Sequence, residues 1–195
     1  MRRTFWKRYA LGVAALGLGL VSAPASAWCD FVTGGGFIIT TADGAHAPAM
    51  ANFGVHGGCK KNGPDAPFWG HLNYIDHFYS PPGHVQSLTI TAYRLIETRG
   101  GEKNPKRKGT RDICGTAATN RPAYPFVDFR VRVTDNGEPG TGDIFMIKLA
   151  ISGTKTEIYS TFADDGTLKG GNIQLHKPNA STNVTPIPSG TCWDD

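Results

Sequence analysis

The segment Phe126–Ser152, FVDFRVRVTDNGEPGTGDIFMIKLAIS, holds the clearest alternation of apolar and polar residues in the chain. Every second residue is apolar within Phe126–Thr134, and Asp143–Ser152 repeats the pattern. A period of two is typical of a half-buried β-strand, because successive side chains point to opposite faces. The Gly- and Pro-containing loop Asp135–Gly142 separates the two stretches, so we predict that they pair as an antiparallel hairpin.

Short stretches with the same period recur along the chain and end at Gly, Pro, Asn or Asp, while helix signals are nearly absent. About nine short strands, with 25 glycines and 13 prolines in the chain, predict an all-β fold. An antiparallel β-sandwich is our first choice and a β-barrel the second. The other predicted strands are Phe31–Thr40, Ala51–Val55, Phe68–His77, Val85–Glu97, Ile113–Ala118, Glu157–Phe162 and Asn172–His176.

The N-terminus carries the pattern of a cleavable export signal. A basic start, MRRTFWKRY, precedes a short apolar run, and Ala25–Ala27 matches the A-x-A site of signal peptidase. We therefore predict a signal peptide at 1–27. Both the general secretory route and the twin-arginine route stay open, since Arg2–Lys7 also fits the twin-arginine pattern. The apolar run is too short to cross a bilayer, so we expect no membrane span after cleavage and a periplasmic or extracellular location.

The formal net charge of +4 lies entirely in the predicted signal peptide. Residues 1–27 carry 4 of the 20 Lys and Arg residues and none of the 16 Asp and Glu residues, so the remainder is neutral overall. A neutral chain lacks the basic surface that nucleic-acid binding requires, so we expect no nucleic-acid partner. The basic run Arg99–Arg111 is interpreted as a solvated hairpin loop.

Residues 28–177 are expected to form one domain, because a chain of this length folds around a single core. Residues 178–195 read as an extended tail rich in Pro, Asn, Ser and Thr. In an oxidising compartment, four cysteines favour two disulfides, with three pairings open. We favour Cys59 with Cys114 and Cys29 with Cys192, because the second bond would tie the loose termini together.

Four strings resemble the post-COAP domain family of exported bacterial proteins. They occur in the family's order and span nearly the whole chain after residue 27. The resemblance implies a β-rich module, often appended to larger surface proteins, whose activity is not established. The chain departs from the multidomain members because it is a single module with its own cysteines. The strings are VTGGGFI (Val32–Ile38), GHLNYIDH (Gly70–His77), VTDNGEPGTGD (Val133–Asp143) and GGNIQLHK (Gly170–Lys177).

The loop at 135–143 gathers oxygen ligands of the kind that calcium prefers. Asp135, Glu138 and Asp143 supply three carboxylates, and the glycines between them let the backbone fold inward. The alternative is a hairpin turn in which Asp and Asn hydrogen-bond their own backbone, and this simpler interpretation is favoured. Calcium is therefore an optional cofactor, and none is required.

Asp76, His77 and His176 are candidate ligands for zinc or iron, provided that different strands bring them together. His71 and His77 share a strand face but lie roughly 20 Å apart, too far to hold one ion. Asp76 and His77 point to opposite faces, so one of the two should be buried. The favoured interpretation is a buried Asp76 that accepts backbone N–H groups.

The chain carries no G-x-S-x-G or H-E-x-x-H motif, which argues against the common hydrolase classes. Trp69 and Tyr79 flank loop residues and are candidates for a platform on which a ligand stacks. We therefore expect an exported, non-catalytic binding or structural module of the cell envelope, with a glycan or protein ligand. The alternatives are a metal-dependent hydrolase or oxidase built on Asp76, His77 and His176, and calcium-dependent adhesion through the acidic loop.

Overall fold

A computed structural model describes residues 29–60, 67–81, 83–100, 108–182 and 190–195 of the protein. The predicted signal peptide at 1–27 therefore lies outside the described residues, as does the middle of the basic run, 101–107. Within the described ranges, no helix is long and apolar enough to cross a membrane.

Regular structure in these ranges consists of β-strands and a single 3-10 turn, η1 (Gly140–Gly142). Each strand overlaps one that the alternating pattern predicts, and the first has the predicted bounds. The strands are β1 (Phe31–Thr40), β2 (Ala49–Cys59), β3 (Phe68–Asp76), β4 (Gly83–Arg99), β5 (Lys108–Thr119), β6 (Phe126–Asp135), β7 (Ile144–Ile151), β8 (Glu157–Ser160) and β9 (Gly170–His176).

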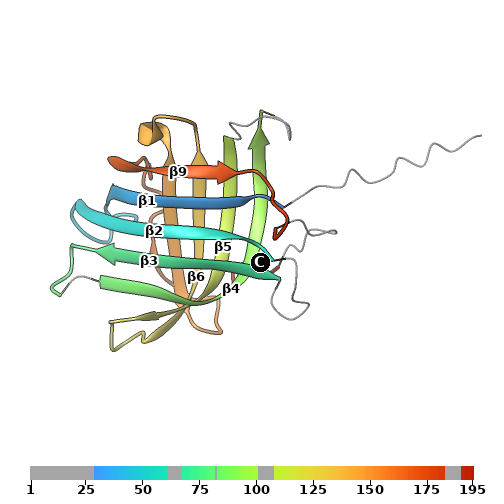
Figure 1. Cartoon of the computed structure of the whole chain (residues 1–195). Coiled ribbons are helices and arrows are strands. Elements are labelled where there is room, and N and C mark those ends of the chain that lie inside the picture. The colour runs from blue at the N-terminus through green and yellow to red at the C-terminus, as the bar shows by residue number, and fades with distance from the viewer. Residues whose placement is uncertain (1–28, 61–66, 82, 101–107, 183–189) are drawn as a thin grey trace, which may run out of the picture.

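All nine strands belong to one antiparallel sheet, in the order β8-β7-β6-β5-β4-β3-β2-β1-β9. Consecutive strands pair as far as β8, and β9 then returns to pair with β1. The sheet curls into a half-barrel, in which β9, β1, β2 and β3 run across the layer that contains β5 and β6 (Figure 1). The all-β antiparallel fold and the β6–β7 hairpin are thus confirmed, with one curled sheet in place of two separate ones.

Strand β4 forms the corner of the half-barrel. It pairs with β3 only from Gly83 to Gln86, and it then runs beside β5 to its end. Three irregularities interrupt the β4–β5 register, the first between Ser87 and Thr89. Such bulges bend and twist a strand, so one strand can belong to both layers. An alternating sequence pattern does not reveal where a strand has a bulge. We therefore expected the two layers of a β-sandwich to be separate sheets, and not one sheet bent at β4.

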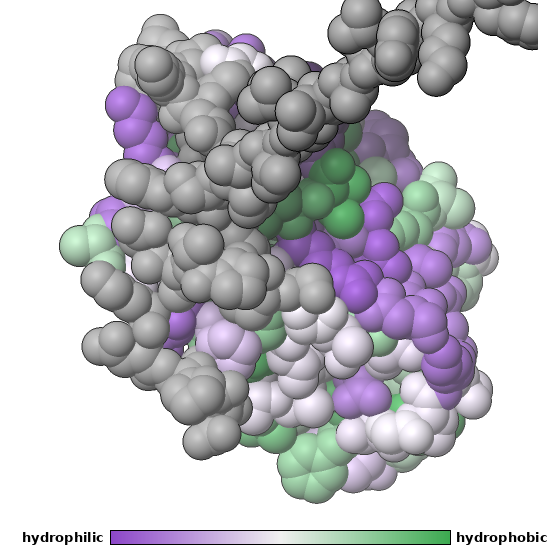
Figure 2. Space-filling view, turned by 90° about the vertical axis from the view of Figure 1, so that its right-hand side faces the viewer, coloured by the Kyte–Doolittle hydropathy of each residue, from purple (hydrophilic) through white to green (hydrophobic). Residues whose placement is uncertain are grey.

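The concave side of the sheet holds the hydrophobic core. Apolar side chains from both layers form one buried cluster, in which Phe53 of β2 stacks on Phe145 of β7 with ring centroids 4.0 Å apart. Burial of one such side chain stabilises the fold by about 1.5 to 3 kcal/mol. Burial of the apolar side chains in this core is therefore the main source of stability. On the side that Figure 2 faces, hydrophilic and hydrophobic residues are interspersed over the described surface.

Two disulfides join Cys29 to Cys59 and Cys114 to Cys192. All four cysteines are bonded, as expected, but the favoured pairing of Cys59 with Cys114 and Cys29 with Cys192 is wrong. The register places Phe31 opposite Gly58, so the cysteines beside them meet at neighbouring strand ends with Cα atoms 5.9 Å apart. The N-terminus of the domain is therefore tied to β2 and not to the C-terminal tail.

The C-terminal tail is tied back through Cys192, onto the outer face of β5. Two ion pairs extend the attachment, from Arg94 to Asp195 and from Arg130 to Asp194, the latter with Nη1 2.6 Å from Oδ2. Thr91 of β4 also donates its hydroxyl to a backbone carbonyl of the tail. The described end of the chain is thus part of the folded domain.

A buried ion pair lies at the end of the half-barrel that contains the Cys29–Cys59 disulfide. Arg111 and Asp30 are both fully buried, with Nε of Arg111 3.0 Å from Oδ1 of Asp30. Tyr93 donates its hydroxyl to the same oxygen at 2.8 Å, and Thr98 accepts from Nη2 of Arg111 at 2.9 Å. The interpretation of Arg99–Arg111 as a solvated loop is therefore wrong at its end, because Arg111 lies inside β5.

Candidate functional site

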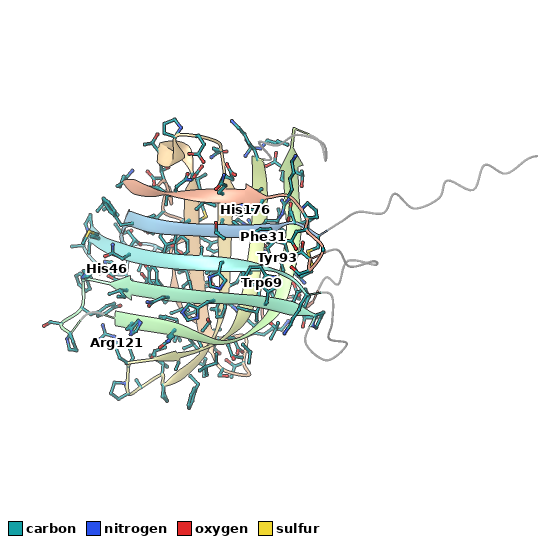
Figure 3. All side chains as sticks on the ribbon, in the orientation of Figure 1. Phe31, His46, Trp69, Tyr93, Arg121 and His176 are labelled. Atoms are coloured by element: carbon teal, nitrogen blue, oxygen red, sulfur yellow. A yellow bond between two sulfur atoms is a disulfide. The ribbon has the colours of Figure 1, made fainter. Side chains whose placement is uncertain are left out.

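A cavity of about 250 Å³ opens at the opposite end of the half-barrel. Figure 3 shows His46 and Arg121 at this end, while Tyr93 marks the end with the buried ion pair. Residues of β3, β4, β6, β7 and β8, the end of β5 and the turn between β5 and β6 line the cavity. Its floor is apolar, and a few polar groups converge on it, which is the usual composition of a small-molecule site. The apolar floor is formed by Val85, Val127, Leu149 and Ile158.

The β5–β6 turn holds Arg121 against the cavity. The Thr119 hydroxyl accepts the backbone N–H of Arg121 at 2.9 Å and donates to the carbonyl of Tyr124 at 2.6 Å. The guanidinium carbon lies 3.8 Å from the centroid of the Tyr79 ring, a cation–π contact. Because both ends of the turn are hydrogen-bonded, the charge of Arg121 is fixed in place beside the apolar floor.

The guanidinium of Arg121 is not fully paired. Its Nη2 atom is buried and has no hydrogen-bond partner, and the side chain forms no ion pair in the described part of the chain. A buried donor without a partner costs about 1 to 3 kcal/mol, and more when the group is charged. The site therefore holds a partly exposed guanidinium with one buried N–H group that no described atom of the protein pairs.

Gly83 provides the space for this arrangement. A Cβ atom at this position would lie 3.2 Å from Nη2 of Arg121 and 3.2 Å from Cδ2 of Tyr79. Both contacts are tighter than ordinary packing, so any larger residue would press on the stacked pair. The glycine at the start of β4 thus helps to shape the cavity.

Asp76 lies at the cavity wall, and both of its carboxylate oxygens have hydrogen-bond partners. Its Oδ2 atom accepts from the Tyr159 hydroxyl at 2.8 Å and lies 3.1 Å from Nε2 of His46, and its Oδ1 atom accepts from the N–H of Phe78 at 2.9 Å. The hydroxyls of Tyr74 and Tyr159 are 2.6 Å apart. Because Tyr159 donates to Asp76, Tyr74 donates to Tyr159. Burial raises the pKa of both tyrosines well above the usual value, which keeps these donors protonated.

His46 is the buried partner of Asp76. Nδ1 of His46 lies 2.7 Å from the carbonyl of Ala47, so both ring nitrogens face oxygen atoms. The imidazole, whose side chain is 1% exposed, also stacks on Phe78 at 4.2 Å. Since Asp76 has this partner, the charge of Arg121 is the uncompensated one at the cavity.

The structure does not bring Asp76, His77 and His176 together. Asp76 is buried and accepts a backbone N–H, as favoured, whereas the exposed His77 contacts Asn52 with Nε2 2.7 Å from Oδ1. His176 pairs with Phe31 at the other end of the sheet and lies 2.7 Å from the Thr33 hydroxyl. In the described ranges, no three His, Cys, Asp or Glu side chains are grouped to hold a metal ion.

Asp135 and Asp143 bind the exposed edge of β9. Their Oδ2 atoms accept from the N–H groups of Leu175 and Ile173, each at 2.8 Å. Their Oδ1 atoms accept N–H groups of their own loop, also at 2.8 Å, as the simpler interpretation of this loop predicts. Burial raises the pKa of Asp143, with neighbouring carboxylates adding to the effect. The carboxylates thus satisfy strand-edge donors that would otherwise be unpaired.

Glu138, the third carboxylate of this loop, accepts from the side-chain amide of Asn172 on β9 at 3.1 Å. All three predicted calcium ligands therefore attach the β6–β7 loop to β9 and close the seam of the half-barrel. The calcium hypothesis stays a prediction, with edge capping as the role that these contacts support.

Trp69 and Tyr79 do not form one platform. Tyr79 lines the cavity beneath Arg121. Trp69 lies on the outer face of β3, where its ring contacts Phe31 and His56 at centroid distances of 6.0 and 5.5 Å. Figure 3 shows Phe31 on β1 and Trp69 on β3, with β2 between them, and both lie away from Arg121. The two aromatic residues therefore belong to different surfaces.

Sequence reasoning missed Arg121, His46 and Tyr159. Each is ordinary in its local context, because Arg121 follows Asn in a turn and His46 follows a glycine-containing loop. Their proximity to Asp76 and Tyr79 depends on the curl of the sheet, which no local pattern encodes. Comparison with family models, curated proteins and solved structures gave no match for this chain.

Proposed function

We propose that the protein is an exported binding module whose cavity takes a small organic anion with an apolar, planar body. The observation that carries the proposal is the buried Nη2 of Arg121, which has no partner beside an apolar cavity. A carboxylate or similar anion would pair with this guanidinium and remove the cost of its desolvation.

The lining supports an apolar and planar ligand body. Tyr79, Tyr124 and the aliphatic floor offer flat and apolar contacts, and the volume of about 250 Å³ suits a small molecule. A ligand of this kind would lie on the floor with its anionic group directed at Arg121. For this cavity, we therefore propose a small anion in place of the glycan or protein ligand that the sequence led us to expect.

The Asp76 network favours binding over catalysis. Both oxygens of Asp76 accept hydrogen bonds, and its Oδ2 atom also contacts the buried ring of His46. A general base needs an accessible lone pair near the substrate, which this carboxylate does not offer. Asp76 and Tyr159 therefore act as a rigid polar wall that positions the lining residues.

Export is supported by the two disulfides, because such bonds persist in oxidising compartments. The four strings that resemble the post-COAP domain family favour the same location. We place the ligand accordingly in the envelope or outside the cell.

Calorimetric titration of the disulfide-bonded protein with benzoate and with benzyl alcohol tests the proposal. The two probes share a ring and differ in charge, so the ratio of their dissociation constants measures the contribution of the anionic group. We expect benzoate to bind at least about tenfold more tightly, equivalent to about 1.4 kcal/mol. Arg121→Met should abolish this preference, because the apolar stem remains while the charge is lost.

Arg94→Met is the matched control, since Arg94 pairs with Asp195 on the outer face, outside the cavity. It should leave the preference for benzoate unchanged. Equal affinity for the two probes in the unmodified protein, or a preference that survives Arg121→Met, would contradict the proposed ligand class.

A further inference from the structure

Two histidines lie directly opposite each other on the outer face of the sheet. His56 of β2 and His71 of β3 are paired in the antiparallel register, with ring centroids 6.0 Å apart. Their neighbours Val55 and Leu72 are buried in the core, so the histidines point outward. Both strands are interior strands of the sheet, and pairing on each side therefore fixes the backbone beneath the two rings.

Ser87 of β4 orients one of these rings. Its hydroxyl oxygen accepts the N–H of Leu72 at 2.9 Å and lies 3.1 Å from Nδ1 of His71. This contact engages Nδ1 and leaves Nε2 of His71 without a hydrogen-bond partner in the described ranges. Neither ring nitrogen of His56 has such a partner there. An imidazole held through one nitrogen while the other is available is the usual arrangement of a metal-binding histidine.

Glycine leaves the neighbourhood of His56 open. Gly54 and Gly58 flank it on the same face of β2, and a Cβ atom at Gly54 would meet no atom within 4 Å. On the other side, the Trp69 ring lies 5.5 Å from the His56 ring between centroids. The pair is therefore bordered by an aromatic ring on one side and by open space on the other.

We propose that His56 and His71 together bind a late first-row divalent metal ion, with Cu²⁺ bound more tightly than Zn²⁺. A ligating imidazole nitrogen lies about 2.1 Å from such an ion, which puts the ring centroid about 3 Å from it. Two ligating rings therefore have centroids up to about 6 Å apart. The observed 6.0 Å is at this limit, so the two side chains rotate toward each other when they bind the ion. Water completes the coordination, and imidazole ligands favour copper over zinc.

This site is separate from the cavity, because neither histidine lines it. It also differs from the set formed by Asp76, His77 and His176, whose members lie at different ends of the sheet. The proposal therefore stands or falls independently of the small-anion ligand.

The test is a titration of the metal-free, disulfide-bonded protein with CuCl₂ and with ZnCl₂, followed by calorimetry and tryptophan fluorescence. We expect one strong site per chain, and quenching by Cu²⁺ because Trp69 is adjacent. His56→Ala and His71→Ala should each weaken Cu²⁺ binding by at least about tenfold, since each removes one of two protein ligands. Trp69→Phe should remove most of the quenching and keep the calorimetric affinity.

His77→Ala is the matched control, because His77 is exposed near the end of β3 and contacts Asn52. It should bind Cu²⁺ as the unmodified protein does. Electron paramagnetic resonance should show coupling to two imidazole nitrogens, reduced to one in His56→Gln and His71→Gln, which retain polar side chains. Unchanged affinity in the His56 and His71 variants, as expected for copper held by the N-terminal amine, would overturn the proposal.

Discussion

Two arginines at opposite ends of the half-barrel differ in how completely the protein pairs them. Arg111 is fully buried, and its guanidinium contacts Asp30, Thr98 and backbone carbonyls. Arg121 stacks on Tyr79, and its buried Nη2 has no partner. The first charge is satisfied by the protein itself. For the second, we propose that a bound anion supplies the partner.

Substitution of the two arginines gives the largest expected effect. Arg111→Met leaves the buried carboxylate of Asp30 without its ion-pair partner, so we expect the free energy of unfolding to fall by about 3 to 5 kcal/mol. Arg121→Met removes a desolvated donor, and stability should stay unchanged or rise. Urea unfolding of both variants measures the difference. If the two variants lost similar amounts of unfolding free energy, the proposed difference between Arg111 and Arg121 would be wrong.

Removal of the Cys29–Cys59 disulfide is expected to cause the second largest loss of stability. This bond closes a loop with a sequence separation of 30, and its removal should lower the free energy of unfolding by about 3 to 4 kcal/mol. Because Cys29 precedes Asp30, we expect the double serine variant to be non-additive with Arg111→Met in a mutant cycle. Simple additivity would show that the bond and the ion pair act independently.

Gly83→Ala changes the end of the half-barrel that contains the cavity, and we expect a smaller effect on stability. The added Cβ would lie 3.2 Å from Arg121 and Tyr79, so we expect benzoate affinity to fall by roughly tenfold as the stacked pair shifts. The free energy of unfolding should change by less than in Arg111→Met, because no buried charge loses its partner. Calorimetry and urea unfolding measure the two quantities. A variant that binds benzoate normally would place the ligand away from Arg121.

The smallest effect concerns pH. Burial lowers the pKa of His176 below its ordinary value of 6.5, partly offset by Asp135. The unfolded chain therefore binds more protons than the folded one just below pH 6.5, so stability is present above this pH and declines as pH falls through it. His176→Gln should reduce this decline in urea unfolding between pH 7.5 and 5.5. The same substitution at exposed His77 is the control, and an unchanged slope in His176→Gln would exclude the assignment.

The strands were most predictable where burial alternates along them, as in β6 and β7. Phe31–Thr40 has its predicted bounds, and the hairpin of β6 and β7 forms as expected. The disulfide pairing was not predictable, since it follows from the register of β1 on β2. Period-two patterns define faces and say little about register or bulges.

The features of the candidate sites were likewise predictable only where they depend on local alternation along a strand. The burial of Asp76 beside an exposed His77 follows from alternation on one strand, and the structure confirms it. The meeting of Arg121 with Tyr79 depends on a turn and a corner, and the pairing of His56 with His71 depends on register. Long-range contacts of this kind have no local signal in the sequence.

The position of β9 beside β1 also determines when the sheet can be completed as the chain is made. Strand β1 emerges first, yet one of its two edges stays unpaired until the C-terminal strand has been made. Long-range pairing of this kind forms slowly, because a large loop must close before any contact is gained. Asp135 and Asp143 then accept two N–H groups on the other edge of β9. The sheet is thus complete only when the last of its nine strands is available, and the same step caps part of a strand edge on which another molecule could polymerise.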